Sequence, residues 1–146
     1  MALASFFLLT KKPVKKTLLI FLIDDDQDDQ HFFSLAASRL PVPVQCTFAD
    51  DGMEALSMLH GTTDFNPDFI FLDINMPRMN GMQCLIELKK IDRLQQIPVY
   101  MCSTSADENI TQGCMTLGAT GVIKKASSIE EIKETLDQIL FRQDGI

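Results

Sequence analysis

Tryptophan, tyrosine, histidine and basic residues are scarce in this 146-residue chain, and the shortage of histidine and of positive charge excludes several kinds of function. Tryptophan is absent, tyrosine occurs once, and the two histidines, His31 and His60, have no cysteine or carboxylate at metal-binding spacing. We therefore expect neither a histidine phosphocarrier nor a histidine metal site. Lysine and arginine number 13 against 20 aspartates and glutamates, which gives a net charge of −7. Because this negative charge repels phosphates, we expect no non-specific binding to nucleic acid.

Long apolar runs and paired cysteines are missing as well. No run approaches the ~20 apolar residues that a membrane-spanning helix needs, so we predict no membrane span. The four cysteines lie far apart and form no CxxC pair. We interpret them as reduced thiols of a cytoplasmic protein rather than as disulfide partners or zinc ligands.

The amino-terminal stretch is apolar over residues 2–9 and basic over residues 11–16, which is the reverse order of a secretory signal. It is typical of a loose tail or, alternatively, of a weak segment for binding a membrane surface or a partner. We therefore predict a flexible extension at 1–16, one domain at 17–141 and a short tail at 142–146.

Two patterns alternate along the predicted domain. Stretches with helical spacing follow short apolar runs that are rich in β-branched or aromatic residues, and several runs are apolar throughout, as in parallel strands covered on both faces. We therefore predict an α/β fold with a doubly wound, five-stranded parallel sheet. The last helix begins at Ser127 or Ser128, and either residue can cap it. The predicted strands lie at 17–23, 44–48, 69–72, 99–102 and 121–123.

The apolar stripes of the predicted helices are interpreted as packing surfaces rather than as binding sites. We expect their side chains to face the sheet. Stripes in the first three helices are formed by Phe32, Phe33, Leu35, Ala36 and Leu40, by Met53, Leu56, Met58 and Leu59, and by Met82, Leu85, Ile86, Leu88 and Ile91.

Polar side chains stand at the carboxyl ends of the predicted strands, where sheets of this kind bind ligands. Carboxylates gathered at one edge repel one another unless a cation lies between them, and oxygen ligands suit Mg²⁺. A carboxylate can attack phosphorus, while a lysine and a hydroxyl can stabilise the charge of the group in transfer. The residues at these ends are Asp24, Asp25 and Asp26 after the first strand, Asp73 after the third, Ser103 and Thr104 after the fourth, and Lys124 and Lys125 after the fifth.

Four segments resemble the receiver domains of bacterial two-component response regulators. They read LIDDD at 22–26, DINMPRMNG at 73–81, IPVYMCST at 97–104 and LGATGVIKK at 117–125. The resemblance extends over about 17–141, and the segment that begins at Asp73 is its most specific part. It implies a flavodoxin-like (βα)5 receiver fold with the strand order 2-1-3-4-5.

The resemblance also implies a role for each matching residue. The cofactor would be Mg²⁺, and the chain would be a phosphoacceptor rather than an enzyme, apart from catalysing its own phosphorylation and dephosphorylation. The implied roles are Asp73 as phosphoacceptor and metal ligand, Asp25 as a direct Mg²⁺ ligand, Asp24 as a ligand mostly through water, Asn75 as a ligand through its backbone carbonyl, Ser103 and Lys125 as partners of the phosphoryl group, and Gly81 as the start of the third helix.

Two of these assignments have neighbours as alternatives. Lys124 and Lys125 are expected to point to opposite sides of the fifth strand, and the spacing from Gly118 favours Lys125. Ser103 and Thr104 compete in the same way, and the spacing from the preceding proline favours Ser103.

Three further acids follow the first strand. Asp26 is ambiguous from its position, and we place it outside the metal ligands. Asp28 and Asp29 are interpreted as solvated charges at the start of the first helix, where negative charge is favourable.

The sequence departs from the family pattern at two positions. Receivers usually have a proline, preceded by a cis peptide bond, where this chain has Ala126. Because a cis bond before a non-proline residue costs about 2.5–4 kcal/mol, we predict a trans Lys125–Ala126 bond, a displaced loop over 125–128, and a lysine that still reaches Asp73. Receivers also often have an aromatic residue where this chain has Val122, so the usual aromatic relay of the fifth strand is absent.

The resemblance implies a signalling switch that receives its phosphoryl group from a sensor histidine kinase or a histidine phosphotransfer protein. Because the chain ends five residues after Phe141, we expect no output domain, so that the signal leaves by protein–protein contact with a downstream target. The implied surface is the fourth helix, fifth strand and fifth helix, which can also form a homodimer. The size and loops resemble stand-alone receivers paired with hybrid or phytochrome-type kinases.

Two rival functions remain at this point. A phosphatase or hydrolase that uses Asp73 as its nucleophile normally has a second acid two positions later, where this chain has Asn75. The second rival is a degenerate interaction module that works without phosphate. It is disfavoured because every side chain that phosphorylation needs is present.

Overall fold

Five parallel strands form one sheet in the order β2-β1-β3-β4-β5, which confirms the predicted topology. The computed structural model describes residues 17–105 and 107–142, so the predicted extension at 1–16 and the tail residues 143–146 lie outside the described residues. Four strands run one residue further than predicted, which brings Asp73 and Ser103 into the sheet. The strands are β1 (Leu18–Ile23), β2 (Val44–Ala49), β3 (Phe69–Asp73), β4 (Val99–Ser103) and β5 (Gly121–Lys124).

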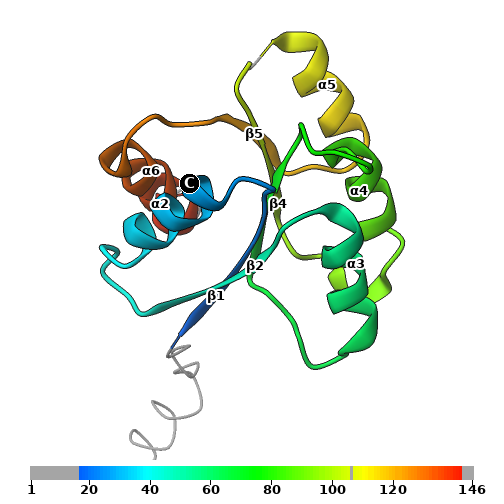
Figure 1. Cartoon of the computed structure of the whole chain (residues 1–146), viewed down its shortest axis with the longest axis horizontal. Helices are drawn as coiled ribbons and strands as arrows, with labels where there is room; N and C mark the ends of the chain where they lie inside the picture. Colours follow the sequence, from blue (N-terminus) through cyan, green and yellow to red (C-terminus); the bar gives the residue numbers. More distant parts are fainter. Residues whose placement is uncertain (1–16, 106, 143–146) are drawn as a thin grey trace, which may run out of the picture.

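Helices cover both faces of the sheet. Figure 1 shows α2 and α6 together on one face and α3, α4 and α5 on the other. None of the helices within residues 17–105 and 107–142 has the length and apolar character needed to cross a membrane. The helices are α2 (Gln27–Ala37), α3 (Gly52–Gly61), α4 (Gly81–Leu88), α5 (Glu108–Thr116) and α6 (Ile129–Asp137); η1 (Asp92–Leu94) is a short 3-10 turn, and η2 (Gln138–Arg142) continues α6 as a π-helical turn.

Each face of the sheet has its own apolar core. Under α2 and α6, Phe33 and Leu136 pack against Phe71 of the central strand β3. Under α3, α4 and α5, side chains such as Leu59 and Leu85 pack against the opposite face of the same sheet. β3 and β4 are buried at every position, and strands buried on both sides are apolar along most of their length, which is why these runs were recognisable in the sequence.

Part of the predicted packing is wrong. Phe32 and Leu35 of α2, Met53 of α3 and Ile86 of α4 are exposed, although the apolar stripes included them. Neighbouring residues on a helix point about 100° apart, so Phe32 cannot face the sheet when Phe33 does. When the apolar stripe of a helix is wider than the face that packs on the sheet, the side chains at the edges of the stripe remain exposed to solvent.

Side-chain caps fix where the helices near the strand ends begin. The Asp26 carboxylate accepts hydrogen bonds from the backbone N–H groups of Asp28 and Asp29, so that α2 starts with only three residues between it and the end of β1. Ser128, rather than Ser127, caps α6 by accepting from the Glu131 N–H. Residues of these types satisfy backbone N–H groups that have no partner within the helix.

Gly81 lets α4 start directly against the end of β3. Its N–H donates to the Ile74 carbonyl at 2.8 Å. A Cβ atom on Gly81 would clash with the backbone oxygen of Asp73, so no side chain fits there without moving the strand end. The helix begins at Gly81 as predicted.

Candidate functional site

The register of the sheet brings the predicted site residues to one edge. Ile23 of β1 pairs with Leu72 of β3, so Asp24 and Asp73, the next residues of their chains, lie side by side. Asp73 pairs with Cys102 of β4, and the following residue, Ser103, pairs with Lys124 of β5. The carboxyl ends of four parallel strands therefore meet at one place, as expected for a doubly wound sheet.

Three carboxylates at this edge lie close enough to hold one metal ion. Asp24, Asp25 and Asp73 each offer an oxygen atom, and these atoms all lie within 4.8 Å of one another. Asp24 and Asp73 are each only 3% exposed, whereas Asp25 is exposed. A set of hard oxygen ligands with one side open to water suits Mg²⁺, which keeps several of its water ligands.

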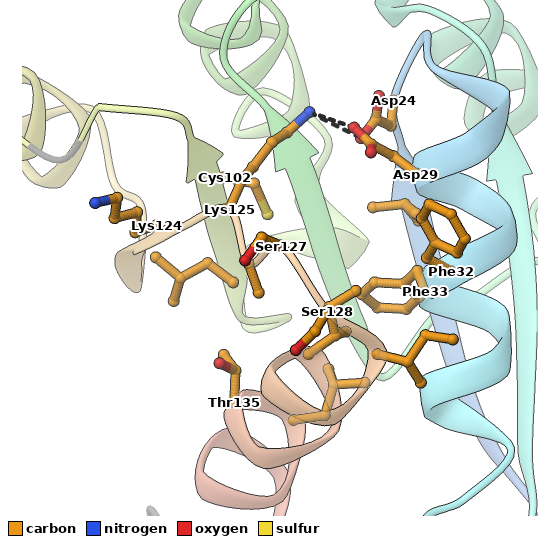
Figure 2. Close-up of a pocket in the computed structure, with 16 residues that line it drawn as sticks. Asp24, Asp29, Phe32, Phe33, Cys102, Lys124, Lys125, Ser127, Ser128 and Thr135 are labelled. Carbon is orange, nitrogen blue, oxygen red and sulfur yellow. Dashed lines mark hydrogen bonds and ion pairs between the residues drawn. The ribbon is translucent and has the colours of Figure 1, made fainter.

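Lys125 is the cation of the site. Its Nζ atom lies 3.2 Å from Asp73 Oδ2, 3.2 Å from Asp24 Oδ2 and 2.9 Å from Asp29 Oδ2. The Lys125 backbone N–H donates to the Ser103 carbonyl at 2.7 Å, which anchors the lysine beside β4. In Figure 2 the Lys124 side chain points away from these carboxylates, so the structure places Lys125, and not Lys124, beside Asp73.

The peptide bond between Lys125 and Ala126 is trans, because no cis bond occurs between residues that the structure describes. This confirms the expectation for a non-proline residue at this position. Lys125 still reaches Asp73, because its long side chain spans the distance. The predicted displacement of the loop over 125–128 from the usual family path stays a prediction.

Burial makes the two inner carboxylates unusual acids. Burial raises the pKa of Asp24 to about 6, with a smaller rise from the Asp73 charge, against the lowering effects of the Asp26 N–H and of Lys125. Burial also raises the pKa of Asp73, although Lys125 and the Asn75 N–H favour its charged form. Burial on its own lowers the pKa of Lys125, but contact with Asp29, Asp24 and Asp73 raises it well above its ordinary value. The site is short of positive charge, because one ammonium faces several carboxylates.

Asn75 and Ser103 lie at the site, and the contacts predicted for them, with Mg²⁺ and with a phosphoryl group, stay predictions. The Asn75 N–H donates to Asp73 Oδ1 at 3.3 Å. The Ser103 hydroxyl donates to the Ser105 carbonyl at 2.6 Å, and the Ser105 N–H donates back to it at 3.1 Å. Ser103 must therefore leave this local pair before it can contact a group on Asp73, and its role stays a prediction.

Asp29 is a site residue that the sequence analysis missed. Its carboxylate pairs with Lys125, in addition to standing in the first turn of α2. A signal was present in the sequence, because Asp29 lies four residues before Phe33, and residues four apart share a helix face. Phe33 is buried against the sheet, so Asp29 points to the same side.

A pocket of about 390 Å³ lies next to the carboxylates, between α2, the end of β5 and α6. Figure 2 shows Lys125 reaching across its upper edge to Asp24 and Asp29. Below them the pocket walls are mostly apolar and include Phe33, Ile123 and Leu136. The pocket adjoins the charged site without adding charged groups at its centre.

The cysteines take no part in this arrangement. All four are free, and burial raises the pKa of Cys102, which lies next to Asp73 in the sheet, to about 12. A thiol with so high a pKa is protonated and unreactive at neutral pH.

Comparison with known proteins shows the same organisation elsewhere. The chain is 34% identical over 97 residues to the chemotaxis protein CheY of Pseudomonas aeruginosa, which is 66% of this chain and 76% of that protein. It is 37% identical over 86 residues to a protein-glutamate methylesterase/protein-glutamine glutaminase of Methanospirillum hungatei. That match is 59% of this chain but only 24% of the methylesterase, so it concerns one part of that larger protein.

The fold agrees with a solved structure as well. The phosphorylated cyanobacterial phytochrome response regulator RcpA superposes with a TM-score of 0.77 and 28% identity, over 86% of this chain and 95% of that one. The sequence pattern of the response regulator receiver domain matches residues 20–137, which include β1 from its third residue, the other four strands, and the site residues at their carboxyl ends. With that match, the strand order and the acidic edge of the sheet in agreement, the chain belongs to the family of response regulator receiver domains.

Proposed function

We propose that this receiver domain takes a phosphoryl group onto Asp73 and signals through the resulting change of its surface. The observation that carries the proposal is the position of Asp73. Its carboxylate is buried at the end of β3, 3.2 Å from the Lys125 ammonium and within 4.8 Å of two further carboxylates. A carboxylate in such surroundings can act as a nucleophile toward phosphorus. The phosphorylated state of RcpA, a similar protein, supports the proposal.

In the proposed reaction a carboxylate oxygen of Asp73 attacks the phosphorus atom of a phosphohistidine. The new P–O bond forms as the P–N bond breaks, and the imidazole leaves with the electron pair and takes a proton from water. With acetyl phosphate as donor, a P–O bond breaks instead and acetate leaves. Asp73 must be ionised to attack, and Lys125 favours the ionised form against the effect of burial.

Mg²⁺ fits the carboxylates of this site. We propose that Asp25 and Asp73 bind it directly, that Asp24 holds it mostly through water, and that Asn75 adds its backbone carbonyl. Buried carboxylates with a raised pKa beside a single lysine are the surroundings in which a divalent cation is most stabilising. When bound, Mg²⁺ would offset the negative charge on the oxygens of the transferring phosphoryl group.

Lys125 and Ser103 would then hold the phosphoryl group after transfer. The Lys125 ammonium already lies beside Asp73 Oδ2, so a short movement brings it to a phosphoryl oxygen. The Ser103 hydroxyl would exchange the Ser105 carbonyl for a phosphoryl oxygen. Breaking that local hydrogen bond would link phosphorylation to the loop that follows β4.

The proposed partners are proteins. A sensor histidine kinase or a histidine phosphotransfer protein would donate the phosphoryl group, and a downstream target would read the surface of α5, β5 and α6, which can also pair with a second copy. Met115 on α5 is an exposed apolar side chain on this surface. We further propose a cytoplasmic location, and no turnover of a second substrate, because Asn75 cannot donate the proton that a hydrolase would need.

The direct test is phosphorylation of the protein by acetyl phosphate, followed by intact mass spectrometry. In the presence of Mg²⁺ the mass should increase by one phosphoryl group. Removal of Mg²⁺ with a chelator before the donor is added should prevent the increase, and restored Mg²⁺ should recover it. A chain that gains no mass under any of these conditions would argue against the proposal.

Substitution of the two exposed acids tests the metal ligands. Asp25→Asn should weaken Mg²⁺ binding by tenfold or more, because it removes a charged ligand from the cluster. Asp26→Asn should leave Mg²⁺ affinity nearly unchanged, since Asp26 caps α2 and asparagine caps a helix equally well. Isothermal titration of both variants with Mg²⁺ provides the comparison. A larger loss of Mg²⁺ affinity for Asp26→Asn than for Asp25→Asn would mean that Asp25 was wrongly assigned as the ligand.

A further inference from the structure

Asp29 makes the shortest ion pair of Lys125, yet it lies outside the cluster of possible metal ligands. The distance to Lys125 Nζ is 2.9 Å for Asp29 Oδ2 and 3.2 Å for both Asp24 and Asp73. The group of carboxylates that could share a metal ion contains Asp24, Asp25 and Asp73, and not Asp29. Lys125 is therefore pulled in two directions, toward the strand ends and toward α2.

The position of Asp29 is fixed by its own helix. Its N–H donates to the Asp26 carboxylate at 3.1 Å, which holds the first turn of α2 at the end of β1. Its side chain remains 40% exposed, whereas that of Lys125 is 21% exposed. Figure 2 shows the Asp29 carboxylate next to that of Asp24, at the rim of the pocket that Lys125 crosses.

A metal ion or a phosphoryl group would change this balance. A cation bound by the cluster would offset the charges of Asp24 and Asp73, which are among its possible ligands, more than the charge of Asp29, and so would weaken their hold on Lys125 more. A phosphoryl group on Asp73 would add negative charge beyond the Asp73 carboxylate, at the end of β3, whereas Asp29 contacts the lysine from α2. If the ammonium moves toward the phosphoryl oxygens, its 2.9 Å contact with Asp29 lengthens, because Asp29 is fixed by its own helix.

We propose that Asp29 is a positioning residue that holds the Lys125 ammonium on the α2 side of the site and competes for it with the phosphoryl group on Asp73. The inference rests on the proposed function. It assigns Asp29 an inhibitory part in phosphorylation, since a lysine held by Asp29 is less available to the transferring group. It also makes the first turn of α2 a segment that loses an ion pair whenever Asp73 is phosphorylated.

The test compares the rates at which acetyl phosphate, with saturating Mg²⁺, phosphorylates the wild type, Asp29→Asn and Asp28→Asn. Asp28 is the matched control, because it stands in the same helical turn and carries the same charge, while the Lys125 partners in the described residues are Asp24, Asp29 and Asp73. Both substitutions remove one acid from a helix start, so their effects on folding should be alike. Thermal melting checks that both variants are folded.

Asp29→Asn should be phosphorylated about threefold faster than Asp28→Asn, which is the effect expected from a partly exposed ion pair. Asp29→Glu, which keeps the carboxylate, should return the rate to that of the wild type. A merely structural residue would not give this pattern. The inference would be overturned, and the proposed function left standing, if Asp29→Asn reacted no faster than Asp28→Asn. The same holds if Asp29→Asn and Asp29→Glu reacted at equal rates. A wild type that is never phosphorylated would overturn the proposed function and the inference together.

Discussion

Replacing Asp73 with asparagine should abolish covalent phosphorylation by acetyl phosphate in the presence of Mg²⁺. Asparagine has nearly the same shape as aspartate, so the end of β3 and the start of α4 at Gly81 should keep their positions. The amide, however, is no nucleophile toward phosphorus under these conditions. Intact mass should show the wild type with one added phosphoryl group and Asp73→Asn with none, which is a loss of at least a hundredfold in rate.

The neighbouring residue Asp26 provides the control for this experiment. Asp26→Asn removes one negative charge close to the site but retains the helix cap, so its phosphorylation should stay within about a factor of two of the wild type. Labelling of Asp73→Asn at the wild-type rate would mean that another side chain accepts the group. A loss of labelling in both variants would mean that charge near the site, rather than Asp73 itself, controls the reaction.

The stability of the metal-free protein should fall as pH rises through the pKa of Asp24. Below pH 3.8, the ordinary pKa, Asp24 is protonated in both the folded and the unfolded state. Between that value and about 6, the folded protein holds a proton that the unfolded chain releases, so the free energy of unfolding decreases as pH increases. Above pH 6 the loss is complete, at roughly 3 kcal/mol for a pKa raised to this extent.

The variant Asp24→Asn isolates this effect from the other carboxylates. It should exceed the wild type in stability by roughly 3 kcal/mol more at pH 7.5 than at pH 4. Urea denaturation of both proteins at the two pH values gives the difference. If the difference in the free energy of unfolding between the two proteins is the same at both pH values, burial does not raise the pKa of Asp24.

Mg²⁺ should reverse the loss in the wild type, because it binds only the folded form. At a concentration one hundred times its dissociation constant, a ligand adds about 2.7 kcal/mol to the free energy of unfolding. The gain should be large at pH 7.5 and small at pH 4, where Asp24 is protonated in the folded protein. Sodium chloride at matched ionic strength is the control, since general screening would stabilise the protein equally with either salt.

The sheet and its polar edge were predictable from sequence because both depend on local patterns. Strands buried on two faces, such as β3 and β4, are apolar along most of their length, so these runs were visible, and parallel strands bring their carboxyl ends to one edge. Asp24 and Asp73 could be placed together for that reason alone. In the structure, Ile23 pairs with Leu72, so the residues that follow them, Asp24 and Asp73, lie opposite each other at the end of the two strands.

Contacts that depend on the path between elements were not predictable. Asp29 was interpreted as a helix charge, because its distance from Lys125 depends on how α2 and the end of β5 approach each other. The hydrogen bond from the Ser103 hydroxyl to the Ser105 carbonyl depends on the backbone conformation of the loop after β4. The exposure of Phe32 follows from the rotation of α2 on the sheet, which an apolar stripe defines only approximately.

The position of the phosphoryl group on the chain tests the central claim most directly. The protein is phosphorylated with acetyl phosphate and Mg²⁺, treated with borohydride, which reduces an aspartyl phosphate to homoserine, and digested for peptide mass spectrometry. The account predicts homoserine at position 73 and unchanged aspartate at positions 24, 25 and 29. Homoserine at any of those three positions with none at 73, or a phosphate that survives on a serine or threonine, would contradict it.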